Sequence, residues 1–291
     1  MGGLQPFQLI GGTTAKSERR CVRFVFNMFH ALTSARCFFL ETSPRLFRHP
    51  RRTERLMAKQ PGPGRCVHCL EHLNERNWDH VFPRSWYPDT TPQNLEKWQI
   101  PSCISCNKKY GELEEDLLIR LGLCINPSAA ASAGIATKAL RALDPLQGRN
   151  PKDRKMRQKR RERIQKEVLQ GHRVAREHIY PDFHAHPHIP LSAQYTIPIS
   201  FDKLHQLAKK IVRGIFYLED GKYIEPPYNL QSYPVDHKQA APTIAILDRY
   251  GQIYAREPGI LVRRVVAAED GMSALFSIAI WAQLTLCAHN P

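Results

Sequence analysis

Two segments show the hydrophobic period of an amphipathic helix. In 112–123, leucines recur every three or four residues, at Leu113, Leu117, Leu118 and Leu121. That spacing places apolar side chains on one face, where they can pack on a core. We therefore predict a helix there, and a second one in 201–216, where the pattern is carried by Leu204, Leu207, Ala208, Ile211, Val212 and Ile215.

The C-terminal third of the chain contains short apolar runs separated by polar turns. Runs at 244–247, 253–255 and 260–266 have the length of strands, and Tyr250-Gly251-Gln252 separates the first two like a hairpin turn. The segment 271–288 carries no charged residue, but serine, glutamine and threonine interrupt it. A buried strand or helix is therefore predicted there rather than a membrane span.

Basic residues dominate the segment 149–176, which has one thin apolar edge at Ile164, Val168 and Leu169. This pattern predicts a solvent-exposed helix. Its lysines and arginines could contact phosphates, because such contacts release counterions from a nucleic-acid backbone. A charged surface helix without any ligand fits the sequence equally well.

Three further stretches have no clear period. The segment 127–137 is rich in alanine and serine and is predicted to be a weak helix or a loop. The segment 178–190 holds four histidines among prolines, with only Asp182 as an acidic neighbour, so we predict a surface loop rather than a metal site. Residues 1–56 are rich in arginine and fit either a mitochondrial-type transit peptide or a mis-called gene start before Met57. The mis-called gene start is the favoured interpretation.

Composition narrows the class of protein. Of the 291 residues, 42% are hydrophobic and 24% are charged, as in a globular protein with polar stretches. The formal net charge of +15 favours nucleic acid as a partner, although a basic surface without a partner has the same charge. No membrane partner is expected. A cytoplasmic, reducing compartment is predicted, with organellar targeting by residues 1–56 as the lesser alternative.

Four of the eight cysteines form two Cys-x-x-Cys pairs, Cys66 with Cys69 and Cys103 with Cys106. Two such pairs can give four thiolates to one tetrahedral zinc ion, and a complete four-cysteine shell leaves no open position for chemistry. A small loop-rich module often needs such a metal in order to fold. Reduced buried cysteines and a redox pair are the alternatives, but a redox pair needs only one Cys-x-x-Cys. We predict a structural zinc site.

The segment between and just after the two cysteine pairs resembles a known family. It contains Trp78-Asp79-His80-Val81-Phe82-Pro83, then Asn94-Leu95, and the second cysteine pair is followed at once by Asn107-Lys108-Lys109. In this order the elements resemble the zinc-bound form of the HNH endonuclease family, over about residues 66–122. The resemblance implies a ββα-metal fold, in which a hairpin and a helix hold a catalytic metal between them.

The same resemblance implies a role for each matching residue. His80 would be the general base that activates water, and the side-chain amide of Asn94 would orient it. Asp79 and Asn107 would bind a catalytic divalent metal. Many members have histidine where this chain has Asn107. An amide oxygen suits Mg²⁺ or Mn²⁺, so the departure bears on the identity of the metal. DNA is expected as the substrate before RNA.

These expectations combine into an α+β fold with a zinc-stabilised ββα-metal (HNH) module, a basic helix and a C-terminal α+β unit. Two other functions stay open. A non-catalytic zinc-dependent nucleic-acid-binding module would not need Asp79, His80 and Asn107, and a regulatory protein with a decayed HNH fold would carry its function near the C-terminus. The expected domains are a disordered or mis-called N-terminal extension (1–56), the HNH module with its structural zinc (57–125), a basic linker of helix and loop (126–195) and a small α+β domain of unknown role (196–291).

Overall fold

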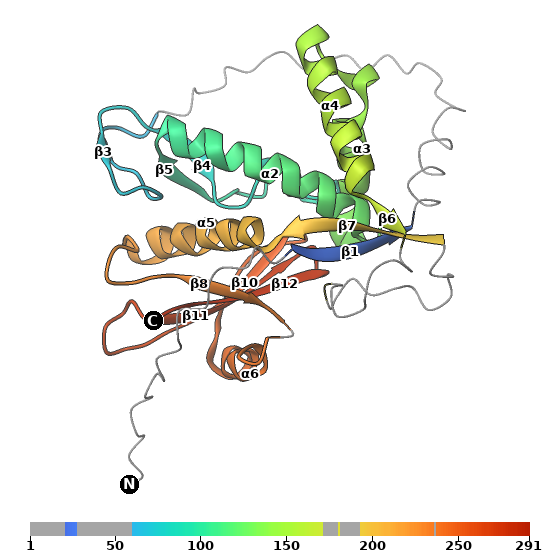
Figure 1. Ribbon diagram of the computed structural model, residues 1–291. Helices are drawn as coiled ribbons and strands as arrows, with labels where there is room; N and C mark the ends of the chain where they lie inside the picture. The colour runs from blue at the N-terminus through green and yellow to red at the C-terminus, as the bar shows by residue number, and fades with distance from the viewer. Residues whose placement is uncertain (1–20, 28–59, 171–179, 181–192, 236) are drawn as a thin grey trace.

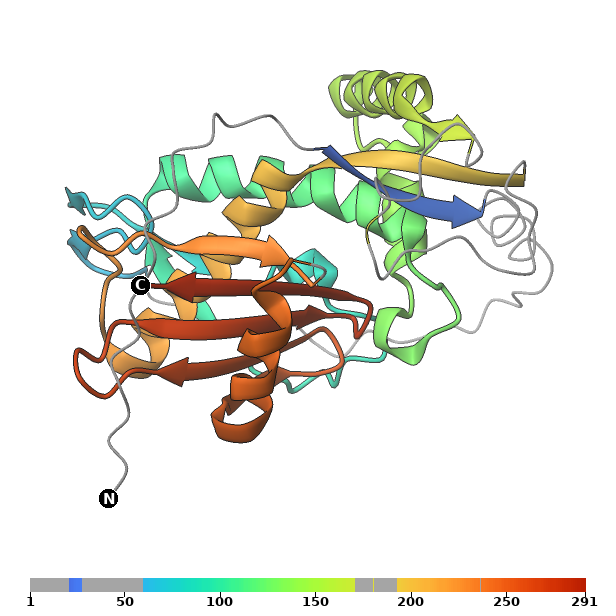
Figure 2. The same cartoon turned by 60° about the horizontal axis from the view of Figure 1, so that its bottom comes forward.

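The chain folds into layers of helices and antiparallel strands. The computed structural model describes residues 21–27, 60–170, 180, 193–235 and 237–291, with the backbone alone for residues 21–27 and 170. Helix α2 (Ile104–Cys124) packs against α5 (Phe201–Asp220), α5 lies on one face of a five-stranded sheet, and α6 (Ala240–Tyr250) covers the other face (Figures 1 and 2). This mixture confirms the α+β class.

The five-stranded sheet is antiparallel throughout, in the order β8-β12-β11-β10-β9. Phe276 on its β11 strand meets Phe216 of α5, with ring centroids 5.6 Å apart. The uncharged segment 271–288 forms β11 and most of β12, so the prediction of a buried element there is confirmed. Within the described part of the chain, every helix is too short or too polar to pass through a bilayer. The strands are β8 (Gln231–Pro234), β9 (Gln252–Arg256), β10 (Ile260–Val266), β11 (Ala274–Ile280) and β12 (Leu284–Asn290).

The sequence predicts one strand in this region that the structure does not contain. The helix expected over 201–216 is α5, and the strands expected at 253–255 and 260–266 are β9 and β10. The run 244–247, however, lies within helix α6, which ends just before Gly251, so no hairpin turn forms there. The buried residues Ala240, Thr243 and Leu247 of α6 follow a helical spacing, but an apolar run of four residues is too short to distinguish a helix from a strand.

Two short hairpins precede α2. Strand β2 (Gly64–Arg65) pairs with β3 (His72–Leu73), and β4 (Asn77–His80) pairs with β5 (Gln99–Ser102). The single turn η1 (Arg84–Trp86) follows β4 in the connection between the second pair. Helix α2 begins at Ile104, directly after β5, so the chain here runs strand, strand, helix. The helix predicted over 112–123 is confirmed and begins earlier than its leucine pattern indicates.

The segment after α2 is helical. Residues 127–137 contain the turn η2 (Ala130–Ser132) and the start of α3 (Ile135–Leu143), and the turn η3 (Pro145–Gln147) leads to α4 (Pro151–Glu167). The side chain of Asn150 accepts a hydrogen bond from the Asp153 amide and so caps α4. The basic helix expected in 149–176 is therefore present, as far as the described residues extend.

A second sheet contains residues distant in sequence. Strands β6 (Leu169–Gln170) and β1 (Cys21–Asn27) pair with opposite sides of β7 (Gln194–Ser200), both antiparallel. No element was expected within residues 1–56, so β1 differs from the sequence interpretation; strand pairing depends on a distant partner that the local pattern does not reveal. The rest of residues 1–56 and, apart from Tyr180, the histidine segment 178–190 lie outside the described residues.

One hydrophobic core connects the expected HNH module with the C-terminal unit. Trp86 and Trp281 are both buried, with ring centroids 5.1 Å apart, and the indole N–H of Trp281 donates to the Trp86 carbonyl at 2.7 Å. Gly214 lets α5 approach β4 closely, because a Cβ there would lie 2.5 Å from a methyl group of Val81. The expected domain boundaries stay a prediction, but residues from both ranges are buried against each other.

A partly buried ionic cluster ties α2 to α4 and α5. Asp116 of α2 accepts from Arg120 at 3.0 Å, from Arg163 of α4 at 2.8 Å and from Lys203 of α5 at 2.5 Å. Burial raises the pKa of Asp116, but the Lys203 hydrogen bond and the three cations lower it more, so the net shift is below the usual value. The ionised carboxylate therefore stabilises the contact between the three helices.

Substituting the two helical glycines Gly214 and Gly111 by alanine should have opposite effects on stability. Alanine favours a helix by about 1 kcal/mol over glycine, and at Gly111 of α2 a Cβ meets no atom within 4 Å. At Gly214 the same methyl group overlaps Val81, and overpacking costs about 1–3 kcal/mol. Urea unfolding should therefore show Gly111→Ala at or above wild-type stability and Gly214→Ala below it. Equal effects would contradict the close approach.

Asp116→Asn should lower the free energy of unfolding at pH 7 by about 2 kcal/mol, because the buried Arg120 and the more exposed Arg163 and Lys203 lose a shared carboxylate. Since the folded-state pKa of Asp116 is depressed, its contribution is present above the unfolded pKa of about 3.9 and is lost as pH falls through the folded value. The difference from wild type should thus shrink between pH 5 and pH 2, as measured by urea unfolding. Glu112→Gln, at an exposed position of the same helix, is the control. A difference independent of pH would refute this account.

Candidate active site and metal centre

The four paired cysteines form one cluster. The Sγ atoms of Cys66, Cys69, Cys103 and Cys106 all lie within 4.8 Å of one another, and those of Cys69 and Cys103 are 3.9 Å apart. Four thiolates around zinc, each about 2.3 Å from the metal, lie about 3.8 Å from one another in a tetrahedron. The cluster is therefore close enough to bind a metal ion such as zinc, as predicted.

Local backbone geometry prepares these sulfur atoms for a metal. Sγ of Cys66 accepts hydrogen bonds from the backbone N–H groups of His68 at 3.4 Å and of Cys103 at 3.3 Å. Cys103 is the N-cap of α2, and its Sγ accepts from the Cys106 N–H at 3.2 Å. Burial raises the pKa of Cys66, but hydrogen bonds from the backbone N–H groups of Cys69, Cys103 and His68 lower it more, to about 7. The fold thus favours the thiolate of Cys66, the form that binds metal, whereas burial and the neighbouring cysteines raise the pKa of Cys69 and Cys106.

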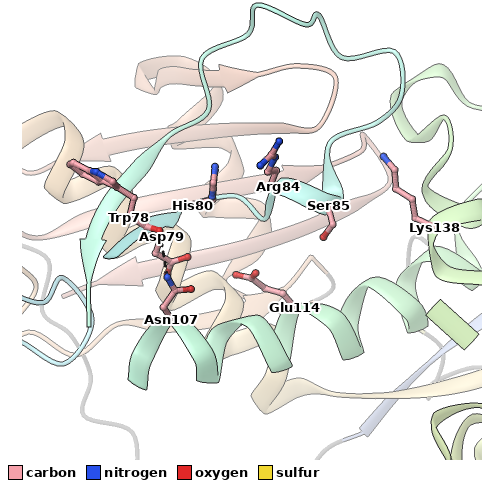
Figure 3. Close-up of a pocket in the computed structure, with 8 residues that line it drawn as sticks. All are labelled: Trp78, Asp79, His80, Arg84, Ser85, Asn107, Glu114 and Lys138. Atoms are coloured by element: carbon pink, nitrogen blue, oxygen red, sulfur yellow. Dashed lines mark hydrogen bonds between the residues drawn. The ribbon is translucent and has the colours of Figure 1, made fainter. Parts of the chain in front are cut away.

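An open cavity of about 610 Å³ lies between the β4–β5 hairpin and α2 (Figure 3). It brings together three of the residues picked out in the sequence: Asp79, His80 and Asn107. Asn94, the fourth, is exposed in the loop before β5 and does not line the cavity. The lining residues are Trp78, Asp79, His80, Arg84, Ser85, Asn107, Glu114 and Lys138.

Asp79 is a buried carboxylate with two strong partners. Its Oδ2 lies 3.0 Å from Nε2 of His68, and its Oδ1 accepts from the ammonium of Lys210 at 2.8 Å. Burial raises the pKa of Asp79, but the hydrogen bond from His68 and the charge of Lys210 lower it more, so the net shift is below its usual value. Because His68 lies between Cys66 and Cys69, it connects the cysteine cluster directly to the cavity.

His80 is half-buried at the end of β4, next to Gln99 on the paired strand. The amide nitrogen of Gln99 lies 3.1 Å from Nε2 of His80, so Gln99 occupies the position beside the ring that the sequence assigned to Asn94. Strand pairing explains the difference, because Gln99 is directly opposite His80 in the register. Burial, followed by the charges of Lys210 and Arg84, lowers the pKa of His80 against the opposing effect of Asp79, and the imidazole is neutral near pH 7.

Helix α2 presents Asn107 and Glu114 to the cavity from the same side (Figure 3). The amide N–H of Asn107 donates to the Trp78 carbonyl of β4 at 3.4 Å, which leaves its carbonyl oxygen for another partner. Glu114 bonds to Lys210 as well, which places that lysine between two carboxylates. Burial raises the pKa of Glu114 to about 7, with Lys210 acting in the opposite direction. The cavity therefore contains an imidazole and several oxygen donors within a basic rim.

Four residues of this site were not found from the sequence: His68, Gln99, Glu114 and Lys210. A histidine inside a Cys-x-x-Cys pair and a glutamate two helical turns after Asn107 are weak signals that also occur on ordinary surfaces. The sequence signal for Lys210 was stronger, because this lysine interrupts the apolar face of 201–216 three residues after Leu207. A lysine on a buried face requires a carboxylate partner, but its identity follows only from the tertiary structure.

The cysteine cluster should bind one zinc ion per chain. Cys103→Ser removes one of four ligands while its hydroxyl can still cap α2, so zinc content and thermal stability should both fall through the loss of the metal. Cys124→Ala changes a buried cysteine outside the cluster and should retain zinc. Elemental analysis of the purified proteins measures the metal content. Equal zinc content in the wild-type protein and Cys103→Ser would exclude this cluster as the zinc site.

No protein-family model, curated protein or solved structure matches the chain. The HNH resemblance of residues 66–122 therefore depends on the order of its residues, together with a cysteine cluster that can bind metal and a cavity that contains three of the matching residues.

Proposed function

We propose that the chain is a metal-dependent endonuclease of the HNH type, which hydrolyses phosphodiester bonds in DNA. The observation that supports this most strongly is that Asp79, His80 and Asn107, chosen from the sequence alone, line one open cavity beside the cysteine cluster. The strand, strand, helix order of β4, β5 and α2 agrees with a ββα-metal module.

In this proposal His80 is the general base. Its neutral imidazole accepts a proton from water while the water oxygen bonds to phosphorus and the bond from phosphorus to the departing sugar oxygen breaks. The side-chain amide of Gln99 lies beside Nε2 of the ring. For Nδ1 to accept the proton from water, Nε2 must carry the ring hydrogen and donate it to the carbonyl oxygen of Gln99, which requires the other orientation of that amide. The departing oxygen takes a proton from solvent, so that the products are a phosphate monoester and a hydroxyl.

Asp79 and Asn107 would hold the catalytic metal, which we propose to be Mg²⁺ or Mn²⁺. When bound, such an ion stabilises the charge that develops on the phosphoryl group and on the leaving oxygen. The donors fit a hard cation, because both side chains present oxygen and a carboxylate oxygen that already accepts one hydrogen bond keeps a second lone pair. Arg84 adds positive charge to the cavity and suits a phosphate next to the scissile bond, and Lys138, which is paired with Asp89 at 2.9 Å, also lines the cavity.

A non-catalytic nucleic-acid-binding module is the second candidate, and the environment of Asp79 favours it. Both oxygens of this carboxylate already have partners inside the protein, as in a structural ion pair. Helix α4 supplies a basic surface in either case. Arg160 and Arg163 are paired with Glu115 and Asp116 of α2, while the exposed residues of α4 include Lys152, Lys155, Lys159, Arg161 and Lys166.

The wild-type protein should nick or cut plasmid DNA with Mg²⁺ or Mn²⁺, and His80→Ala should reduce the rate at least about 100-fold, because general-base catalysis contributes that much. His72→Ala, at an exposed position of β3, is the matched control and should cut like wild type. Gel assays measure cutting, and zinc content and thermal unfolding verify that each variant is folded.

The outcomes separate the two candidate functions. Metal-dependent cutting that His80→Ala removes and His72→Ala retains supports the nuclease and the base together. If the zinc-loaded wild type binds DNA and RNA but cuts neither, the binding module replaces the nuclease as the function.

A further inference from the structure

Lys210 has an environment unlike that of the other lysines described. It lies in the middle of α5 with a fully buried side chain, and its ammonium contacts Asp79 of β4 and Glu114 of α2. The face of the Tyr110 ring lies 5.4 Å from Nζ. A segment far from the cysteine pairs in sequence thus places a positive charge between two carboxylates of the cavity.

The ammonium of Lys210 contacts two residues that line the cavity, Asp79 and Glu114, but Lys210 itself lies outside the lining. The lysine therefore approaches the carboxylates from the α5 side, and the cavity opens on their other side. Gly214, one turn further along α5, permits the close approach of this helix to the strand that carries Asp79.

Burying two carboxylates close together is unfavourable without a cation, because each ionised group loses hydration and the two repel each other. With Lys210, the three groups carry a formal charge of −1 when both acids are ionised. Without it, the charge is −2 when both acids are ionised. A divalent cation that enters the cavity would relieve the same repulsion from the opposite side.

We propose that Lys210 is a tethered counter-cation of the candidate catalytic site, which positions Asp79 and Glu114 for a divalent metal and weakens the binding of that metal by its own charge. Helix α5 then supplies a positioning residue to the site. The catalytic consequence rests on the proposed function, whereas the metal-binding consequence can be measured without cleavage.

The test compares Lys210→Met with Lys203→Met. Methionine replaces the aliphatic part of the side chain and removes the ammonium, and Lys203 is an ion-paired lysine two turns earlier on α5 that does not line the cavity. Both variants should melt below wild type without added metal. With Mn²⁺, the dissociation constant of Lys210→Met, measured by electron paramagnetic resonance of free Mn²⁺, should be at least about 10 times lower than that of wild type.

Thermal unfolding gives the second measurement. Saturating Mn²⁺ should raise the melting temperature of Lys210→Met by about 4 °C more than that of wild type, because tighter binding stabilises the folded state further. Lys203→Met should respond like wild type. Zinc content is measured in each sample, so that exchange at the cysteine cluster is recognised. Equal Mn²⁺ affinity in Lys210→Met and wild type would overturn the proposal.

A double variant keeps the test decisive if Lys210→Met does not fold. Lys210→Met with Glu114→Gln restores the formal charge of −1, so it should fold and bind Mn²⁺ less tightly than Lys210→Met. Where the single variant is unfolded, a folded double variant with Mn²⁺ affinity within about threefold of wild type supports the counter-cation. Two unfolded variants would mean that Lys210 acts through packing, and the proposal fails.

Failure of this inference and failure of the proposed nuclease give different results. Cutting by wild type together with unchanged Mn²⁺ affinity in Lys210→Met rejects the counter-cation alone. Tight Mn²⁺ binding by Lys210→Met in a protein that never cuts nucleic acid rejects the nuclease alone.

Discussion

The buried carboxylate of Asp79 imposes the constraint on which the arrangement of this protein depends. An ionised carboxylate is removed from water only when charged or hydrogen-bonding groups replace its hydration. Here one replacement comes from His68, between the cysteines of the first pair, and the other from Lys210 in α5. The cysteine cluster, strand β4 and the C-terminal unit therefore meet at the Asp79 carboxylate.

Packing around that point follows from the same requirement. The Lys210 ammonium can reach Asp79 only if α5 lies close to β4, and Gly214 allows it to do so by leaving room for Val81. The apolar residues beside Lys210 then join the core beneath the hairpin, where Trp86 meets Trp281. The HNH-like segment is thus part of a continuous core, which explains why its polar residues have partners from outside the segment.

The sequence predicted those features that depend on local spacing. The leucine period predicted α2, the apolar period predicted α5, and the two Cys-x-x-Cys pairs predicted the metal-binding cluster. Strand pairing depends on distant partners, so β1 was missed and the run 244–247 was wrongly assigned to a strand.

In the candidate site, too, local sequence predicted the residues of one motif but not their partners from distant segments. Asp79, His80 and Asn107 were named because they lie in a short ordered motif, and the structure brings them to one cavity. Lys210 and Gln99 were missed because their role depends on which residue faces them after folding. In the structure Gln99 rather than Asn94 lies beside the ring of His80, because β5 pairs Gln99 with His80.

Charge links the fold to the proposed function. The net charge of +15 could arise from basic residues spread evenly, but the acidic side chains of α2 are largely used inside the protein. Glu114, Glu115 and Asp116 each pair with a lysine or arginine from α4 or α5. Acids that neutralise interior or interhelical cations cannot also shield the outer surface of α4, where lysines are exposed. The outer surface of α4 therefore keeps an excess of positive charge, which suits a phosphate backbone under either of the two proposed functions. Surface charge thus cannot distinguish the nuclease from the binding module. What distinguishes them is whether the few polar side chains between β4, α2 and α5 bind a metal and activate water.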